Sequence, residues 1–183
     1  MSQLKRYIIL IVVLPVLALM NHSCFEGLND FTYDGPTVVE FSHLSYIPDG
    51  ADWVSVGSYW AATITGNVDD APLQVSLVGP QRTEPVEIGY YIADQVYRDK
   101  EENKLKLEQP AHDEWELYET TAVAGTDYNI LDGGIIIIPA KSSFGPLSIE
   151  LTPTAERTLY IVLEAGDVAP SENYKIFRLN IEP

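Results

Sequence analysis

The side chains of this chain that could do chemistry are aromatic rings, carboxylates and a single cysteine. Its 183 residues include three Trp and eleven Tyr. Exposed rings of this kind stack on sugars. Trp53 lies beside a turn, and Trp115 and Tyr118 follow a charged segment. We therefore predict these three as a ligand platform, although packing alone also accounts for each of them.

Carboxylates in segments that we expect to be loops or turns are the second candidate group. Calcium is bound by about six to eight oxygens, and loops at one end of a sandwich can converge. The candidate calcium ligands are Asp69, Asp70, Asp113, Glu114 and Asp127. No Asp-x-Asp-x-Asp-Gly loop is present. Calcium is thus a hypothesis, and the alternative is a merely solvated acidic surface.

Catalytic signatures are missing from the sequence. There is no Gly-x-Ser-x-Gly, His-Glu-x-x-His or glycine-rich phosphate loop. His112 stands next to Asp113 and Glu114, which could serve acid–base or metal chemistry but is typical of a solvated cluster. Since 27 residues are acidic, some pair reaches the spacing of a glycosidase by chance. We predict that the protein is not an enzyme.

Cys24, the only cysteine, follows an apolar run of 14 residues, Tyr7 to Met20, which begins after Lys5 and Arg6. The run is shorter than the roughly 20 residues of a membrane span, and it suits a secretory signal. The segment resembles a bacterial lipoprotein signal peptide, in which the cysteine is acylated. The resemblance implies lipidation at Cys24. An ordinary cleaved signal is the alternative.

The sequence divides into a signal peptide (1–23), a tether (24–35) and one domain (36–183). Residues 24–183 carry nine basic and 27 acidic residues, a formal charge of −18. Such a surface repels nucleic-acid phosphates, so nucleic acid is excluded as a partner. We therefore expect the protein to be attached to the membrane by the lipid on Cys24. Acidic residues just after it resemble the surface-export signal of Bacteroidota lipoproteins, which implies an exposed position on the outer membrane.

Alternation of apolar and polar residues dominates the domain and predicts strands. The expected strands are 39–41, 54–65, 73–77, 86–92, 135–138, 147–151, 159–163 and 177–181. The continuous run Ile135 to Ile138 predicts a strand covered on both faces. The charged segment 93–114 is predicted as a protruding hairpin, or else as a short surface helix or a mobile loop. The fold class is all-β, an antiparallel sandwich.

Two short motifs extend this prediction. Ala124-Gly125-Thr126-Asp127-Tyr128 and Ile138-Pro139-Ala140 resemble the signature of Calx-beta-type domains, and the same turn occurs in small Bacteroidota lipoproteins of unknown function. The resemblance implies an immunoglobulin-like sandwich. On physical grounds Gly125 suits a positive φ and Asp127 can fix the turn through backbone hydrogen bonds. We therefore interpret Asp127 and Tyr128 as structural residues.

The function that these observations favour is a lipid-anchored, non-catalytic module at the cell surface. We expect it to bind glycan or an outer-membrane protein partner, as an accessory of polysaccharide uptake. The alternative is a calcium-dependent adhesion or structural module. A glycan-active hydrolase is the least favoured, because no catalytic constellation supports it.

Overall fold

The computed structural model describes residues 35–42, 53–55, 60–71 and 73–183. In these ranges no helix is long and apolar enough to cross a membrane. Strands such as Leu73–Val78 and Ile176–Glu182 form where apolar and polar residues alternate. The strands are β1 (Val38–Phe41), β2 (Trp53–Ser55), β3 (Trp60–Thr65), β4 (Leu73–Val78), β5 (Val86–Ala93), β6 (Gln95–Asp99), β7 (Lys104–Lys106), β8 (Trp115–Glu119), β9 (Tyr128–Ile130), β10 (Ile135–Ile138), β11 (Phe144–Leu147), β12 (Ile149–Leu151), β13 (Arg157–Leu163) and β14 (Ile176–Glu182).

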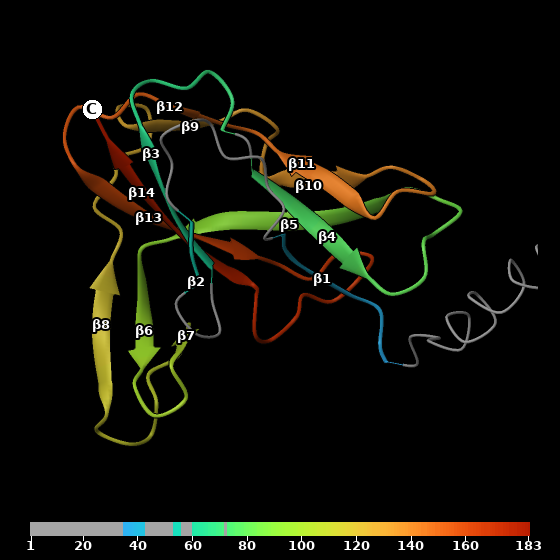
Figure 1. The fold of residues 1–183 in the computed structure, drawn as a ribbon, viewed down its shortest axis with the longest axis horizontal. Helices are drawn as coiled ribbons and strands as arrows, with labels where there is room; N and C mark the ends of the chain where they lie inside the picture. Colours follow the sequence, from blue (N-terminus) through green and yellow to red (C-terminus); the bar gives the residue numbers. More distant parts are fainter. Residues whose placement is uncertain (1–34, 43–52, 56–59, 72) are drawn as a thin grey trace, which may run out of the picture. The chain divides into compact units, whose positions relative to one another are not determined.

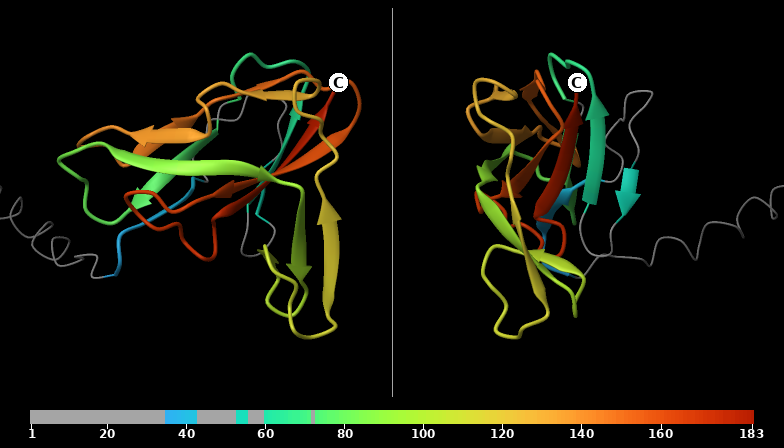
Figure 2. Two further views of the ribbon diagram at one scale, coloured as in Figure 1. Left: turned by 180° about the vertical axis from the view of Figure 1, so that it is seen from behind. Right: turned by 90° about the vertical axis from the view of Figure 1, so that its left-hand side faces the viewer.

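The strands form four sheets (Figures 1 and 2). A six-stranded sheet has the order β10-β5-β13-β14-β3-β2, and two three-stranded sheets have the orders β1-β4-β11 and β7-β6-β8. A two-stranded sheet is formed by β12 and β9. All strand pairs are antiparallel except β14 with β3, which is parallel. The described protein is therefore all-β, as the alternation predicts.

The core lies between the sheet β1-β4-β11 and the six-stranded sheet. Alternate side chains of β1, β4 and β11 meet those of β5, β13 and β14 in one buried cluster. At its centre the rings of Phe41 and Phe177 lie 5.2 Å apart between centroids. Burying each large apolar side chain contributes about 1.5–3 kcal/mol. Two sheets that share one core give the protein a sandwich-like character.

Two predicted strands are each divided in the structure. The expected strand 54–65 is wrong as one element, because β2 and β3 pair antiparallel with Ser55 opposite Trp60. The expected strand 147–151 is divided between β11 and β12, which belong to different sheets. At this break the Asp132 carboxylate accepts hydrogen bonds from the Ser148 N–H (3.0 Å) and the Tyr90 hydroxyl (2.6 Å). Periodicity alone cannot reveal such a change of partner.

The isoleucine run of β10 is not covered on both faces, so that prediction is wrong. Ile136 and Ile138 are buried, whereas Ile135 and Ile137 are 50% and 51% exposed. The reason is the position of β10 at the edge of the six-stranded sheet. A parallel sheet covers both faces of its strands, but this antiparallel edge has only one face on the core.

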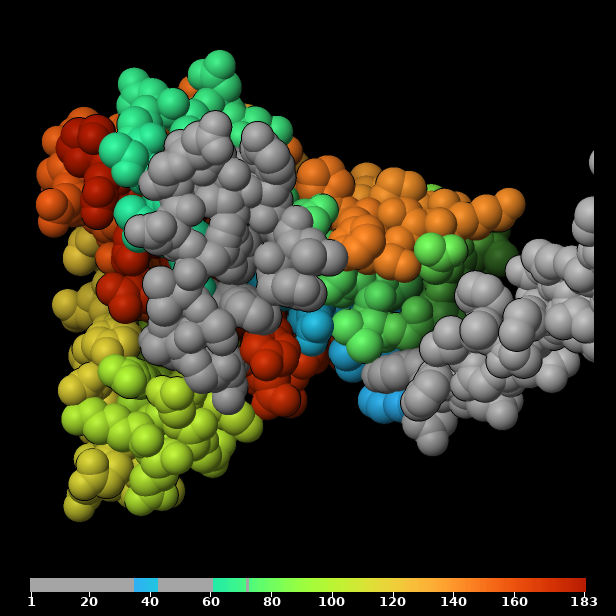
Figure 3. Space-filling view, in the orientation of Figure 1, coloured from blue at the N-terminus to red at the C-terminus, as the bar shows by residue number. Residues whose placement is uncertain are grey.

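The charged segment forms a hairpin, one of the predicted alternatives. β6 pairs with β7 in the register Tyr97 opposite Lys106, and β8 pairs with the other edge of β6. We call β6, β7 and β8 the hairpin sheet. Its strands run away from β5 and β13 in Figure 1, and its atoms gather below those of β14 in Figure 3.

Candidate functional site: the hairpin sheet

Apolar contacts attach the hairpin sheet to the outer face of the six-stranded sheet. Val96 and Leu105 are buried in a second cluster. Their partners there come from β3, β5, β13 and β14, namely Ala61, Ala93, Tyr160, Val162 and Ile176. Because successive side chains of a strand point to opposite faces, the residues that alternate with Val96 lie on the other face of the hairpin sheet.

The predicted platform does not form as expected, because Trp115 and Tyr118 lie on opposite faces of β8. The two positions are three residues apart in one strand, an odd spacing that separates their side chains. Trp53 lies in β2, and its side chain is outside the described part of the protein. Trp115 and Tyr118 therefore have to be considered as two separate surfaces.

On the outer face, Trp115 pairs with Tyr97 of the neighbouring strand. Their ring centroids are 5.3 Å apart, and the ring planes meet at 77°. Leu117 stands opposite Tyr97 in the register and is 44% exposed. The Gln95 amide donates a hydrogen bond to the Tyr97 hydroxyl at 3.2 Å. The result is an aromatic surface with an apolar neighbour and a polar rim.

On the inner face, Tyr118 is fixed from several sides. Its ring is stacked on Tyr160, at 6.3 Å between centroids and an interplanar angle of 10°. The Arg178 guanidinium lies 5.9 Å from its centroid, within the range of a cation–π contact. Its hydroxyl donates to Glu116 (3.0 Å) and accepts from Arg98 (3.3 Å). Tyr118 therefore joins the hairpin sheet to the six-stranded sheet.

Asp99, a buried residue that sequence reasoning did not single out, holds the turn between β6 and β7 through Glu102 and the loop between β7 and β8 through His112. Its carboxylate accepts hydrogen bonds from the Glu102 N–H (2.9 Å), Lys106 Nζ (2.7 Å) and His112 Nε2 (3.2 Å). His112 Nδ1 accepts from the Glu114 N–H at 3.1 Å, so the ring proton is on Nε2. The Glu102 N–H, Lys106 and His112 hold the pKa of Asp99 well below its usual range.

The partner of His112 is thus a residue thirteen positions earlier in the chain, and not only its sequence neighbours Asp113 and Glu114. A carboxylate that already accepts three hydrogen bonds has little remaining capacity to bind a ligand. We call Asp99 with its three donors the Asp99 clasp. It orders the chain immediately before Trp115, which is a structural task.

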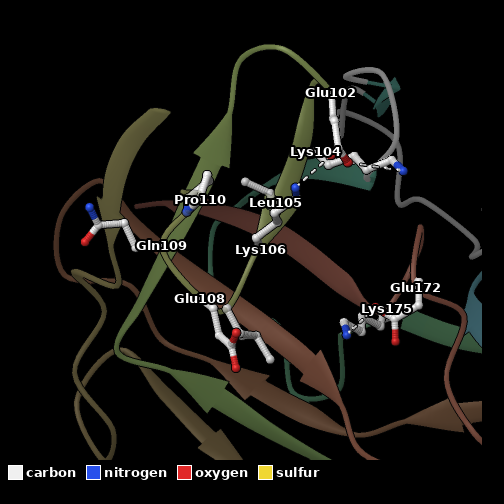
Figure 4. Close-up of a pocket in the computed structure, with 10 residues that line it drawn as sticks. Glu102, Lys104, Leu105, Lys106, Glu108, Gln109, Pro110, Glu172 and Lys175 are labelled. Carbon is white, nitrogen blue, oxygen red and sulfur yellow. Dashed lines mark hydrogen bonds and ion pairs between the residues drawn. The ribbon is translucent and has the colours of Figure 1, made fainter. Parts of the chain in front are cut away.

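A cleft of about 580 Å³ runs beside β7 (Figure 4). One wall consists of β7 and the residues that follow it, and the other carries Glu172 and Lys175. Its three lysines already have carboxylate partners. Lys175 lies 2.8 Å from Glu172, and both Lys104 and Lys106 lie within 4 Å of Glu102. The cleft therefore offers no spare cation to an anionic ligand.

The predicted calcium ligands do not converge. Asp69 and Asp70 lie between β3 and β4, whereas Asp113 and Glu114 lie between β7 and β8. Throughout the described ranges, no group of three or more histidines, cysteines and acidic residues is arranged to hold a metal ion. Calcium binding therefore gains no support from the geometry and stays a hypothesis.

Asp127 serves its turn, as interpreted from the motif. The buried carboxylate accepts from the Val123 N–H (2.9 Å), the Thr154 N–H (3.2 Å) and the Thr154 hydroxyl (2.9 Å), and Arg157 lies 3.4 Å away. Burial alone would raise the pKa of Asp127, but these hydrogen bonds and Arg157 outweigh it and lower the pKa. Gly125 has a φ of 75°, as expected.

Comparison with known proteins adds no assignment, because no protein-family model and no curated protein matches this chain. The class that the structure defines is an all-β, sandwich-like protein with a hairpin sheet attached to its larger sheet. Cys24 lies outside the described residues, and its lipidation stays a prediction.

Proposed function

We propose that this protein is a lipid-anchored, non-catalytic module on the outer-membrane surface, and that its hairpin sheet binds polysaccharide. The observation that carries the proposal is the pair formed by Trp115 and Tyr97, which stands on the face of the hairpin sheet away from its buried cluster. Aromatic rings offer large, rigid contact area at low entropic cost.

The geometry of the pair suits a sugar chain better than a flat ligand. Sugar rings present C–H groups that pack on the face of an aromatic ring. Because the two rings meet at 77°, they offer faces in two directions, as a twisted polysaccharide requires. Leu117 extends the apolar area, and Gln95 supplies a hydrogen-bonding group at its rim. The strongly negative chain favours a neutral glycan over a polyanionic one.

We infer further that the sandwich is immunoglobulin-like and related to Calx-beta-type domains. In an immunoglobulin sandwich the strands A, B and E share one sheet and C, F and G share the other. With strands A, B, C, E, F and G assigned to β1, β4, β5, β11, β13 and β14 in chain order, and no strand assigned to D, the neighbours are β1-β4-β11 and β5-β13-β14. The hairpin sheet is then an insertion after strand C. Solution of a related structure with a different strand order would contradict this assignment.

The anchor rests on Cys24 and the signal that precedes it. Mass spectrometry of the mature protein should find an acylated amino-terminal Cys24, and Cys24→Ala should release the protein from membranes. Cleavage at another position, or an unmodified thiol, would contradict the anchor without affecting the proposed ligand.

Affinity electrophoresis in gels that contain neutral polysaccharides tests the binding. We expect retardation of the wild-type protein by at least one glucan, xylan or mannan, and its loss in Trp115→Ala. Phe144→Ala is the matched control, because Phe144 is an exposed aromatic residue on β11. Unretarded wild-type protein in all three gels, or equal retardation of Trp115→Ala, would refute the proposal.

A further inference from the structure

A row of polar side chains crosses the outer face of the six-stranded sheet, on three neighbouring strands. The Thr158 hydroxyl donates to Asn180 Oδ1 (3.0 Å), and Asn180 Nδ2 donates to the Thr63 hydroxyl (3.4 Å). Arg178 Nε donates to the same Asn180 oxygen at 3.2 Å. The row therefore has fixed positions before any ligand arrives, which lowers the entropic cost of binding.

A groove of about 310 Å³ lies over this row. The polar side chains that line it are two hydroxyls, two carboxylates, one amide and two guanidiniums, from Thr121, Thr158, Glu156, Glu182, Asn180, Arg157 and Arg178. Of the two arginines, Arg157 is already paired with Asp127 at 3.4 Å. The Arg178 guanidinium lies over the Tyr118 ring, 5.9 Å from its centroid, so an aromatic ring adjoins the guanidinium end of the row. The volume falls at the lower end of small-ligand sites.

We propose that this groove binds a neutral sugar residue and forms a second glycan site, separate from the Trp115–Tyr97 pair. The groove adjoins Tyr118, and Tyr118 and Trp115 point to opposite faces of β8. The inference shares the ligand class of the proposed function, but it depends on different residues.

Hydrogen-bonding capacity is the main argument. Within the described residues, the terminal nitrogens of Arg178 make no hydrogen bond, and the carboxylates of Glu156 and Glu182 make no hydrogen bond or ion pair. A guanidinium presents a rigid fork of N–H donors, and a carboxylate accepts through two oxygens. Neighbouring sugar hydroxyls offer both donors and acceptors at short spacing. They can therefore accept hydrogen bonds from the Arg178 guanidinium and donate to the carboxylates of Glu156 and Glu182.

Other ligand classes fit the groove less well. An anion would meet the carboxylates of Glu156 and Glu182 beside Arg178, while Arg157 is already paired with Asp127, in a chain of formal charge −16. A metal ion would be repelled by Arg178. An extended peptide needs a free strand edge, and β13, β14 and β3 each have a strand on both sides.

Nuclear magnetic resonance on the full chain in detergent micelles tests the proposal. The probes are glucose, galactose, mannose and xylose, each titrated to high millimolar concentration. We expect at least one of them to shift the signals of Asn180 Nδ2 and Arg178 Nε in a saturable manner. The same shifts should occur in Trp115→Ala. If none of the four sugars produces saturable shifts at these atoms, the proposal is refuted.

Substitutions then test the named groups. Thr158→Val keeps the side-chain volume but loses a hydroxyl, and it should lower the affinity for the sugar that binds by roughly fivefold. Arg178→Lys removes the planar fork of N–H donors, and it should lower the affinity for the same sugar by roughly tenfold. Arg82→Lys, the same change in an exposed loop, is the control. Wild-type affinity in both Thr158→Val and Arg178→Lys would overturn the site.

The two glycan proposals can fail separately. Saturable shifts at Asn180 without gel retardation would support the groove as a glycan site and refute glycan binding by the Trp115–Tyr97 pair. Retardation that Trp115→Ala abolishes, without any shift at Asn180, would refute the groove as a glycan site and support glycan binding by the pair.

Discussion

Asp127→Ala is the most direct test of what holds this fold at the Ala-Gly-Thr-Asp-Tyr turn. The substitution removes an acceptor from the N–H groups of Val123 and Thr154, from the Thr154 hydroxyl and from Arg157. Val123 lies in the segment before β9, Thr154 lies in the segment before β13, and Arg157 is the first residue of β13. One carboxylate therefore joins segments that lie about thirty residues apart.

The expected loss of stability follows from the hydrogen bonds. A buried donor that loses its acceptor costs about 1–3 kcal/mol, and two backbone N–H groups are affected, while the hydroxyl and Arg157 can turn to solvent. We expect the free energy of unfolding to fall by about 3–5 kcal/mol. In a domain of this size the melting temperature should then fall by about 6–20 °C. Asp127→Asn keeps one acceptor oxygen, so its free energy of unfolding should fall by roughly half as much as that of Asp127→Ala.

Urea unfolding followed by circular dichroism measures the effect, with Asp113→Ala as control. Asp113 is exposed, and its carboxylate has no partner among the described residues. It should therefore change stability by less than about 0.5 kcal/mol. Because folding lowers the pKa of Asp127 from 3.8, its contribution is present above that pKa and is lost as the pH falls through the folded value.

The difference between wild type and Asp127→Ala should therefore be full at pH 7 and smaller at pH 3. A wild-type unfolding free energy in Asp127→Ala at pH 7 would refute the structural role of this residue. A difference that grows toward acid would refute the lowered pKa.

Two further predictions concern backbone contact and the hairpin sheet. Gly166→Ala should lower the free energy of unfolding by about 1–3 kcal/mol in urea titrations, because a Cβ there overlaps the Glu87 carbonyl oxygen; a gain in stability would contradict that close approach. Asp99→Asn should speed hydrogen exchange of the Glu102 and Glu114 amides by at least about tenfold, because the Asp99 clasp opens, while exchange in β13 stays slow. Unchanged exchange at both amides would show that the clasp does not order the loop.

The alternation of residue types predicts the central strands well. The expected strands 86–92 and 177–181 correspond to Val86–Ala93 and Ile176–Glu182, because each has one face on the core and one outside. Strand order is a different matter. Thr63 and Asn180 meet across neighbouring strands although 117 positions separate them, and no local pattern encodes that partner.

The candidate site depends on register more than on residue type. Trp115 stands out by composition, but Tyr97 does so only once β6 and β8 are known to pair with Tyr97 opposite Leu117. A strand at Trp115–Glu119 would by itself have separated Trp115 from Tyr118, since an odd spacing in a strand changes the face. That strand lies just after the charged segment 93–114 and was not among the expected strands. A binding surface built from a hairpin is thus fixed by two long-range choices, the docking of Val96 and Leu105 and the pairing of β8, and both arise from packing rather than from the motif.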